Sequence, residues 1–293
     1  MPIALASQPS PDTNAWRIHH DAARGIWIDT FDGNWLVQTQ QNSLPKGIID
    51  SAKSHAHSLY WKPRDAAAST EPEHQWGEII KVPFSVTENG ARFRIDFSAG
   101  YSPGIFLDQR LNRREVWQRS KKSASPKVLN AFAYTGAFSV MAALGGAQTS
   151  TLDLSKTYLD WCWENFALND LDRETHYGVK GDAFDWLASF ARKERKFHGI
   201  VLDPPTFSRN KKRTFRTDRD YAELAKLGVS LLEPGGWILC CANTHRMNLR
   251  DFEKQVKEGI RLAGRRVSSI ASQPMPDEFR GDDYLKSLWV DVD

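Results

Sequence analysis

The chain has 293 residues, of which 41% are hydrophobic and 26% charged, a composition typical of a globular protein with one large or two modest domains. The net charge of +3 is too small for a protein whose whole surface binds nucleic acid, so any such contact must come from local clusters. The three cysteines form no CxxC pair and no zinc spacing, which argues against disulfides and a metal site and favours a reducing, cytoplasmic location.

Residues 1–14 are rich in Pro, Ser and Gln, lack the pattern of a signal peptide and are expected to be disordered. Residues 15–104 are expected to form a small α+β module. Within it, GIWIDT and NWLVQTQ flank the turn sequence FDG and predict a hairpin, and a second hairpin is predicted around Asn89–Gly90. Between the hairpins, LPKGIIDSAKSHAHSL has the apolar spacing of a helix, and PRDAAASTEPEHQWGE is expected to be a loop.

Residues 105–293 alternate between strands and helices. Segments with helical spacing separate the strands, and these segments are GAFSVMAALG, KTYLDWCWENFALN, DAFDWLASFARKE and RDYAELAKLGVSLL. The strands are KVLNAF, TSTLDL, THYGV, HGIVLD and GGWILCCA, followed by RRVSSIASQ and YLKSLWVDV, which are expected to pair antiparallel. This order predicts an α/β, Rossmann-like fold with a mostly parallel, doubly wound sheet that binds its ligand at the carboxyl ends of the strands.

The residues after the first three strands suggest what that ligand is. A single glycine, Gly136, follows the first strand, where a dinucleotide fingerprint would need three; a close backbone approach there suits a cofactor without phosphates, and a turn glycine is the alternative. The Asp153 carboxylate after the second strand can accept both hydroxyls of a ribose. After the third strand, Asp182 can receive the amine of an adenine and Ala183 offers a backbone N–H. For both acids the alternative is a helix N-cap, although Ser155 can also cap the helix after Asp153.

The fourth strand ends in Asp203, Pro204 and Pro205. Each proline lacks a backbone donor and favours an extended predecessor, so this stiff exit leaves carbonyl groups available to hold a planar ring beside Phe207. The alternative is a plain Pro-Pro turn. Acids after three strands and one glycine after the first together fit a nucleoside that carries no phosphates, and S-adenosylmethionine is such a molecule.

The stretches VLNAFAYTGAFSVMAALGGA, LDLSKTYLDWCWENFALNDL, GDAFDWL, VLDPPTFSRNKK and LLEPGGWIL follow ENGARFRIDFSAGYSPGIFLDQRLNRREVW in the chain. With them, the chain resembles the class I S-adenosylmethionine-dependent methyltransferases, and more narrowly the bacterial 23S rRNA large-subunit methyltransferases with a DPPK/TF motif. The resemblance covers about residues 89–240 and implies a seven-stranded sheet. It also implies a cofactor site with Phe132 to Gly136, including Tyr134 and Thr135, at the methionine moiety, Asp153 at the ribose and Asp182 at the adenine. Leu154, Ser155 and Ala183 are expected to bind the cofactor as well, and Asp203 to Pro205 to face the methyl donor and the target base.

Two departures from the family bear on function. Some members begin with an RNA-binding PUA domain, whereas this sequence starts almost at the module that follows it. Members that methylate cytosine C5 carry a cysteine after the fifth strand, because its thiolate must first add to C6. Asn243 stands at the equivalent position here, as in the guanine-N7 branch, while Cys240 and Cys241 fall earlier and are expected to be buried. The resemblance therefore implies direct transfer to a base nitrogen, guanine being favoured, with Asn243 and the Asp203–Pro205 turn orienting the base.

Two basic segments are candidates for contact with RNA phosphates. SRNKKRTFRTDRD directly follows the fourth-strand turn, and RLNRREVWQRSKK is expected to be a helix with Arg113, Arg114 and Arg119 exposed. A solvated face is the alternative for both. The expected contacts with RNA, ribosomal RNA being favoured, are Arg113, Arg114, Arg209, Lys211, Lys212 and Arg213.

Two other functions stay open: methylation of a small molecule or a protein side chain, and an inactive module that binds RNA or a protein partner. The sequence specifies neither the target nucleotide nor the oligomeric state, for which a homodimer stays open.

Overall fold

The computed structural model describes residues 3–65, 70–81, 83–100, 102–209 and 214–293. The chain divides into two compact units. Unit 1 comprises residues 1–110 together with 276–280, and unit 2 comprises residues 111–275 together with 281–293. The expected boundary after residue 104 lies shortly before this division, and no sequence pattern indicated that residues 276–280 return to unit 1.

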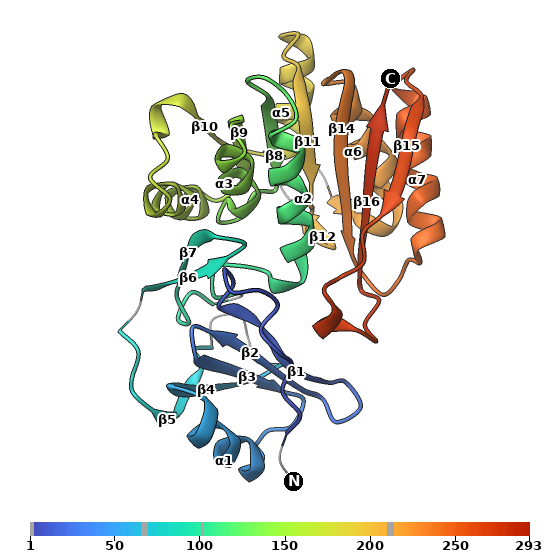
Figure 1. The fold of residues 1–293 in the computed structure, drawn as a ribbon. Helices are drawn as coiled ribbons and strands as arrows, with labels where there is room; N and C mark the ends of the chain where they lie inside the picture. Colours follow the sequence, from blue (N-terminus) through green and yellow to red (C-terminus); the bar gives the residue numbers. More distant parts are fainter. Residues whose placement is uncertain (1–2, 66–69, 82, 101, 210–213) are drawn as a thin grey trace. The chain divides into compact units, whose positions relative to one another are not determined.

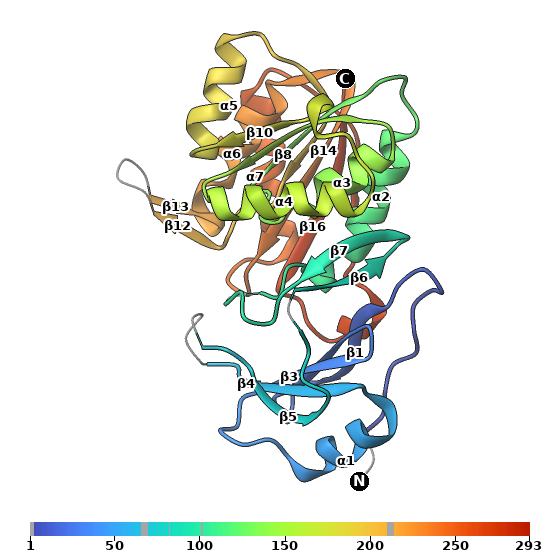
Figure 2. The same ribbon diagram turned by 90° about the vertical axis from the view of Figure 1, so that its left-hand side faces the viewer.

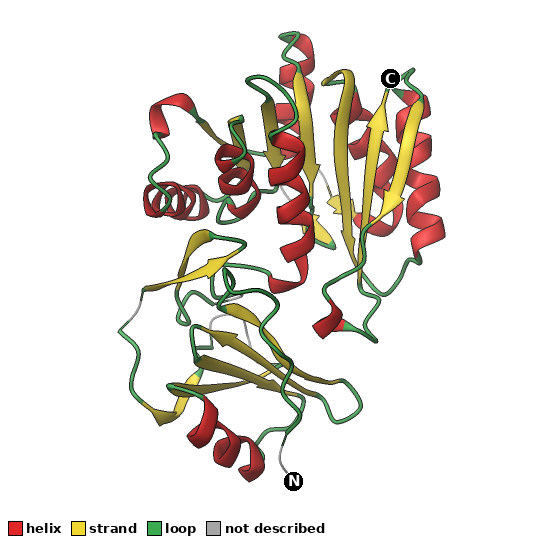
Figure 3. Ribbon diagram, viewed as in Figure 1, coloured by secondary structure: helices red, strands yellow, loops and turns green. Residues whose placement is uncertain are grey.

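Unit 1 is built on a five-stranded sheet in the order β1-β2-β3-β4-β5, with one helix, α1, along the chain between β3 and β4 (Figure 3). The first predicted hairpin is present, and its turn residues Asp32 and Gly33 have the positive φ angles of 53° and 77° that suit a tight two-residue hairpin turn. β3 and β4 run parallel, which requires the crossover that α1 provides. The bounds are β1 Ala15–Asp21, β2 Ile26–Phe31, β3 Asn34–Thr39, α1 Lys46–His55, β4 Ser58–Pro63 and β5 Glu73–Gly77.

The core of unit 1 forms because apolar residues alternate along its strands. Ile28 of β2 and Val37 of β3 are fully buried, and Ile48 and Ala52 of α1 pack onto the same cluster. The predicted helix is therefore present but shorter than expected, because the chain turns into β4 after His55. The prediction of a loop for the whole segment up to β5 was wrong for EHQWG, which is an edge strand with mostly exposed side chains.

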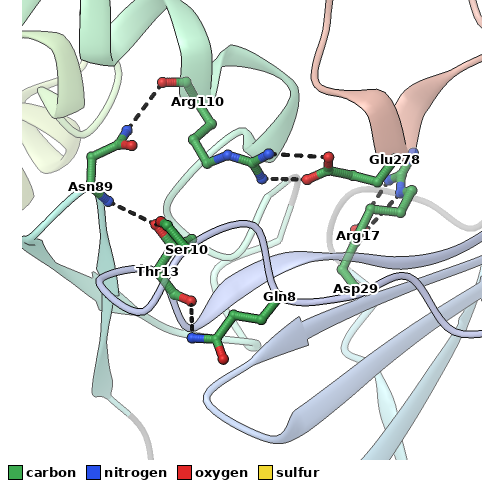
Figure 4. Close-up of polar contacts among 8 residues, drawn as sticks. All are labelled: Gln8, Ser10, Thr13, Arg17, Asp29, Asn89, Arg110 and Glu278. Atoms are coloured by element: carbon green, nitrogen blue, oxygen red, sulfur yellow. Dashed lines mark hydrogen bonds and ion pairs between the residues drawn. The ribbon is translucent and has the colours of Figure 1, made fainter.

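The second predicted hairpin is also present, as β6 Phe84–Glu88 and β7 Ala91–Ile95 around the Asn89–Gly90 turn. The described part of the N-terminal segment, expected to be disordered, packs onto it. The hydroxyl of Thr13, a fully buried residue, accepts a hydrogen bond from the Asn89 backbone N–H at 3.0 Å (Figure 4). The Asn14 N–H donates to the Thr87 carbonyl at 2.8 Å. These bonds satisfy backbone groups of the hairpin, which accounts for the order of the segment.

Unit 2 contains the predicted seven-stranded sheet, in the order β10-β9-β8-β11-β14-β16-β15 (Figure 1). The first five strands of this order run parallel, and β16 runs antiparallel to both of its neighbours, as the α/β prediction required. The bounds are β8 Lys127–Ala131, β9 Gln148–Asp153, β10 Tyr177–Lys180, β11 Phe197–Leu202, β14 Leu232–Asn243, β15 Val267–Ser272 and β16 Leu285–Val292, with a short ribbon of β12 Phe207–Arg209 and β13 Thr214–Arg216.

Helices cover both faces of this sheet (Figure 2). Residues of α5, α6 and α7 pack on one face with Leu129 and Ile200, and residues of α2 and α3 pack on the other with Val128 and Val201. Helix α7 was not predicted as a separate element. In the described part of the chain, no helix combines the length and the apolar character needed to cross a membrane. The bounds are α2 Arg110–Ser120, α3 Ala137–Leu144, α4 Lys156–Leu168, α5 Ala183–Arg192, α6 Thr217–Val229 and α7 Leu249–Leu262.

Candidate active site

The parallel strands of unit 2 end at one level. Ala131 of β8 is paired with Leu152 of β9 on one side and with Leu202 of β11 on the other. The carboxyl ends of adjacent parallel strands form the usual ligand-binding edge of such a sheet. The residues that follow these three paired positions therefore lie in one row at that edge: Phe132, Asp153 and Asp203.

The loop after β8 has an unusual backbone. Phe132 and Tyr134 have φ angles of 61° and 50°, a region that residues with a Cβ rarely adopt, and Gly136 has a φ of 76°. The side-chain amide of the buried Asn165 donates to the Thr135 carbonyl at 2.9 Å and fixes the loop. Such strained conformations cluster at ligand sites, where the surrounding structure must hold them. Because Thr135 is itself fully buried, its side chain is enclosed by protein.

Gly136 has a packing role that the sequence did not indicate. A Cβ atom at this position would lie 2.1 Å from the Cys162 Sγ atom of α4 and 2.8 Å from its Cβ atom. The glycine therefore allows α3 to start against α4. This packing role adds to the cofactor contact that the sequence predicts for Gly136, which stays a prediction.

Asp153 lies half-buried at the end of β9, and both of its carboxylate oxygens accept backbone hydrogen bonds. The Tyr134 N–H donates to Oδ2 at 2.8 Å, and the Ser155 N–H donates to Oδ1 at 2.8 Å. Burial raises the pKa of Asp153, and these backbone bonds oppose the rise. Ser155, not Asp153, caps α4, since its hydroxyl accepts from the Tyr158 N–H at 3.3 Å. Each carboxylate oxygen has a second lone pair, so Asp153 can still accept ribose hydroxyls.

One apolar and two aromatic side chains, those of Leu154, Tyr134 and Tyr158, surround Asp153. Leu154 is 61% exposed, and it offers apolar surface beside the carboxylate, which an adenine ring can cover. The rings of Tyr134 and Tyr158 meet edge to face with their centres 4.6 Å apart. Burial, followed by the charge of Asp153, raises the pKa of Tyr158. Sequence reasoning missed Tyr158, because one tyrosine on a helix face has no distinguishing signal.

Asp182 acts as the helix cap that the alternative reading proposed. Its Oδ1 atom accepts from the Phe184 N–H at 3.0 Å and from the Asp185 N–H at 3.2 Å, at the start of α5. Ala183 is buried at the first position of the helix. The Gly181 N–H donates to the Asp153 carbonyl at 3.0 Å, so the turn before Asp182 is attached to the end of β9. Any contact of Asp182 with an adenine would therefore add to a structural role.

The turn Asp203–Pro205 is held by α6. The Tyr221 hydroxyl, fully buried, donates to the Leu202 carbonyl at 2.9 Å, and the Thr217 hydroxyl donates to the Pro205 carbonyl at 3.1 Å. Burial raises the pKa of Tyr221 well above its usual value, so this donor keeps its proton. Of the carbonyls in the Asp203–Pro205 turn, that of Pro205 thus accepts a hydrogen bond from the protein itself. Tyr221 and Thr217 carried no sequence signal, because their role depends on how α6 packs.

The end of β14 lies next to this turn. The Thr206 hydroxyl donates to the Asn243 carbonyl, and Phe207, which follows Thr206, is 56% exposed. Cys240 and Cys241 are fully buried within the strand, as predicted. Burial raises the pKa of Cys240 to about 12. Asn243 is half-buried, and Cys162, like the two cysteines of β14, is buried.

The basic residues predicted to contact RNA differ in how exposed the structure shows them to be. Arg114 is exposed, but the prediction that Arg113 is exposed was wrong, since this residue is only 2% exposed. It lies one turn before the buried Val116, on the sheet-facing side of α2, with its guanidinium 5.9 Å from the centre of the Phe138 ring. Arg119 is mostly covered and paired with acids. Lys211, Lys212 and Arg213 lie outside the described residues, and of Arg209 only the backbone, in β12, is described.

This strand order, with an antiparallel strand between β14 and β15 and acids at the carboxyl edge, defines a class I methyltransferase architecture. The model of one family, the S-adenosylmethionine-dependent methyltransferases, matches residues 50–269. The chain belongs to this family and is an enzyme that uses S-adenosylmethionine.

Curated relatives and solved structures that resemble this chain are also described as methyltransferases. YwbD of Bacillus subtilis (strain 168), provisionally named a ribosomal RNA large subunit methyltransferase, is 32% identical over 92% of this chain and 71% of its own length. The ribosomal RNA large subunit methyltransferase K/L of Methylococcus capsulatus is 38% identical over 90% of this chain, which spans only 37% of that protein. The crystal structure of SMU.776, provisionally described as a methyltransferase and complexed with SAH, has a TM-score of 0.84 and 30% identity, covering 97% of this chain and 76% of that one.

Proposed function

We propose that this methyltransferase modifies ribosomal RNA by direct transfer of the methyl group to a nitrogen of a base, with guanine N7 favoured. Relatives named as ribosomal RNA large subunit methyltransferases support RNA as the substrate. The observation that carries the choice of a nitrogen is the burial of all three cysteines. Methylation of cytosine C5 needs an accessible thiolate, and a buried thiol cannot provide one.

The residues at the sheet edge have complementary roles in this proposal. Asp153 accepts the ribose hydroxyls, and Leu154 covers the adenine. The loop from Phe132 to Gly136 holds the methionine part. When bound, S-adenosylmethionine supplies an activated methyl group on a sulfonium.

The turn Asp203–Pro205 and Asn243 orient the target base. They are well placed for this because Tyr221, Thr217 and Thr206 fix the turn and attach it to β14. A preorganised site of this kind lowers the barrier by alignment. Guanine N7 already owns a lone pair, so no proton has to be removed and no general base is assigned. RNA phosphates are contacted by basic side chains, and to this role we assign the exposed Arg114 together with Arg209, Lys211, Lys212 and Arg213 of the basic segment after the turn.

The proposal is tested by incubating the protein with labelled S-adenosylmethionine and ribosomal RNA from a strain that lacks the gene. We expect label in the large-subunit RNA, at a guanine nitrogen. Asp203→Ala should abolish transfer while its affinity for S-adenosylhomocysteine and its unfolding curve stay close to those of the wild type. Label that reaches only protein or small molecules would overturn the assignment of RNA, and label on carbon C5 of cytosine would overturn the mechanism.

The thiols provide a separate prediction. Because burial raises the pKa of Cys162 and of Cys240 to about 12, both thiols stay protonated across the neutral and mildly alkaline range. A thiolate-specific colour reagent at pH 8 should therefore label none of the three cysteines until the protein is unfolded, and then all three. The paired change Cys240→Ser/Cys241→Ser should leave transfer chemistry intact. A rapidly labelled thiol in the native enzyme, or a covalent adduct with RNA, would contradict the proposed mechanism.

A further inference from the structure

A buried lysine lies beside the proposed target-base site. Lys286, on β16, is only 5% exposed, and its ammonium donates to the Thr244 carbonyl at 2.6 Å and to the Asp283 carbonyl. The Thr244 N–H in turn donates to the Tyr284 carbonyl at 2.7 Å. Burial lowers the pKa of Lys286, which reflects the cost of enclosing an ammonium. Through these two hydrogen bonds, the Lys286 ammonium connects the loop that follows β14 to the turn that precedes β16.

The fastened segments carry two aromatic rings. The centres of the His245 and Tyr284 rings are 5.9 Å apart, and the rings meet edge to face. One side of Tyr284 packs against the core cluster that contains Leu285 and Trp289. The side chain of His245 is 67% exposed, and its Nδ1 atom lies 3.1 Å from the Asp283 carboxylate, which sets the orientation of the ring. The result is a fixed and accessible aromatic surface.

This surface continues the edge at which methyl transfer is proposed. Its first residue, His245, lies two positions after Asn243, whose carbonyl accepts a hydrogen bond from Thr206 in the turn that carries the exposed Phe207. Arg246, also exposed, has its backbone N–H bonded to the Thr244 hydroxyl at 3.1 Å. The loop therefore presents aromatic rings and a cation together.

We propose that His245, Tyr284 and Arg246 form a ledge that binds an unpaired nucleotide of the RNA next to the target base. The exposed His245 ring stacks on the nucleobase, the Tyr284 ring supports His245 edge to face, and Arg246 contacts the phosphate of the nucleotide. Proteins hold splayed-out RNA bases by stacking and phosphate contacts of this kind. Lys286 is a positioning residue, because it acts through the backbone of the ledge. The inference rests on the proposed RNA substrate, and it assigns the part of the substrate that flanks the methylated base.

The test measures the affinity of the full chain for an unmodified 23S ribosomal RNA transcript and, separately, for S-adenosylhomocysteine. His245→Ala and Tyr284→Ala should each weaken RNA binding roughly 5- to 150-fold, the range found for single stacked bases, without changing the affinity for S-adenosylhomocysteine. Tyr284→Phe should keep RNA binding. Arg246→Gln should also lower the slope of log affinity against log salt by about one, whereas Tyr284→Ala should leave that slope unchanged.

Tyr177→Ala is the matched control, since this tyrosine of the edge strand β10 is 47% exposed and lies at the start of its strand, away from the carboxyl edge. It should bind RNA as the wild type does. Because Tyr284 packs partly on the core, the exposed His245 keeps the test decisive if Tyr284→Ala does not fold. A wild-type protein that binds and methylates no RNA would overturn the proposed function. A wild type that does both, with unchanged RNA binding in His245→Ala and Arg246→Gln, would overturn this inference alone and leave the ledge to a protein partner.

Discussion

Gly136→Ala is expected to destabilise unit 2 by about 2–5 kcal/mol, a large share of the total stability of a typical domain. Two penalties add. A residue with a Cβ at a φ of 76° costs about 1–2 kcal/mol. The new Cβ atom would also lie 2.1 Å from the Cys162 sulfur, and overpacking of a core of this kind costs about 1–3 kcal/mol. Denaturant unfolding measures the loss, and titration with S-adenosylhomocysteine measures the effect on the cofactor loop.

Two further variants separate the two penalties. Gly146 has a φ of 90°, and an added Cβ atom would meet no described atom within 4 Å, so Gly146→Ala should show only the conformational cost. Cys162→Ala removes the nearer of the two clashing atoms, and combining it with Gly136→Ala should recover part of the stability. Equal losses in the two glycine variants, with no recovery on removing the sulfur, would mean that packing against α4 does not explain the glycine.

The parts of the fold that could be predicted are those whose sequence carries a strong period. The strands of unit 2 are short apolar runs between helical patterns, and right-handed crossovers leave few arrangements for such a series. β5 was missed because EHQWG lies at a sheet edge with exposed side chains and shows no apolar alternation. The return of residues 276–280 to unit 1 has no local signal either, since it depends on a partner far away in the chain.

The residues of the candidate site also fall into some that the sequence predicts and others that it does not. Acids that follow parallel strands must share one edge, so Asp153 and Asp203 could be placed from the sequence. Arg113 could not, because the same helical spacing fits a solvated face and a buried one, and only packing decides between them. The burial of Lys286 was also unpredictable, because its acceptors are backbone carbonyls that any sequence supplies. The sequence therefore predicts which acids lie at the carboxyl edge of the sheet. The residues that hold this edge in place depend on tertiary contacts and could not be predicted from it.

Glu278→Ala is expected to destabilise unit 1 by about 3–5 kcal/mol, because it removes the charged partner of a buried guanidinium. The side chains of Arg110 and Glu278 are 7% and 9% exposed, and they form a two-pronged ion pair (Figure 4). The Arg110 carbonyl also accepts from the Asn89 side chain at 3.1 Å, so the arginine connects the second hairpin to the returning segment. Next to Glu278, the buried Phe279 ring lies 4.3 Å from the guanidinium of Arg17. Thermal or denaturant unfolding of the variant measures the loss.

The same short segment contains its own control. Asp277 pairs with Arg280, but their side chains are 91% and 81% exposed, so Asp277→Ala should change stability by less than about 0.5 kcal/mol. Replacing both buried partners, as in Arg110→Met/Glu278→Leu, should recover most of the lost stability, because it leaves no buried charge without a partner. Recovery would mean that the ion pair contributes more to the specificity with which residues 276–280 pack in unit 1 than to the stability of that unit. If Glu278→Ala proved as mild as Asp277→Ala, the desolvated pair would not be what holds this segment in unit 1, and packing of Phe279 would have to do so.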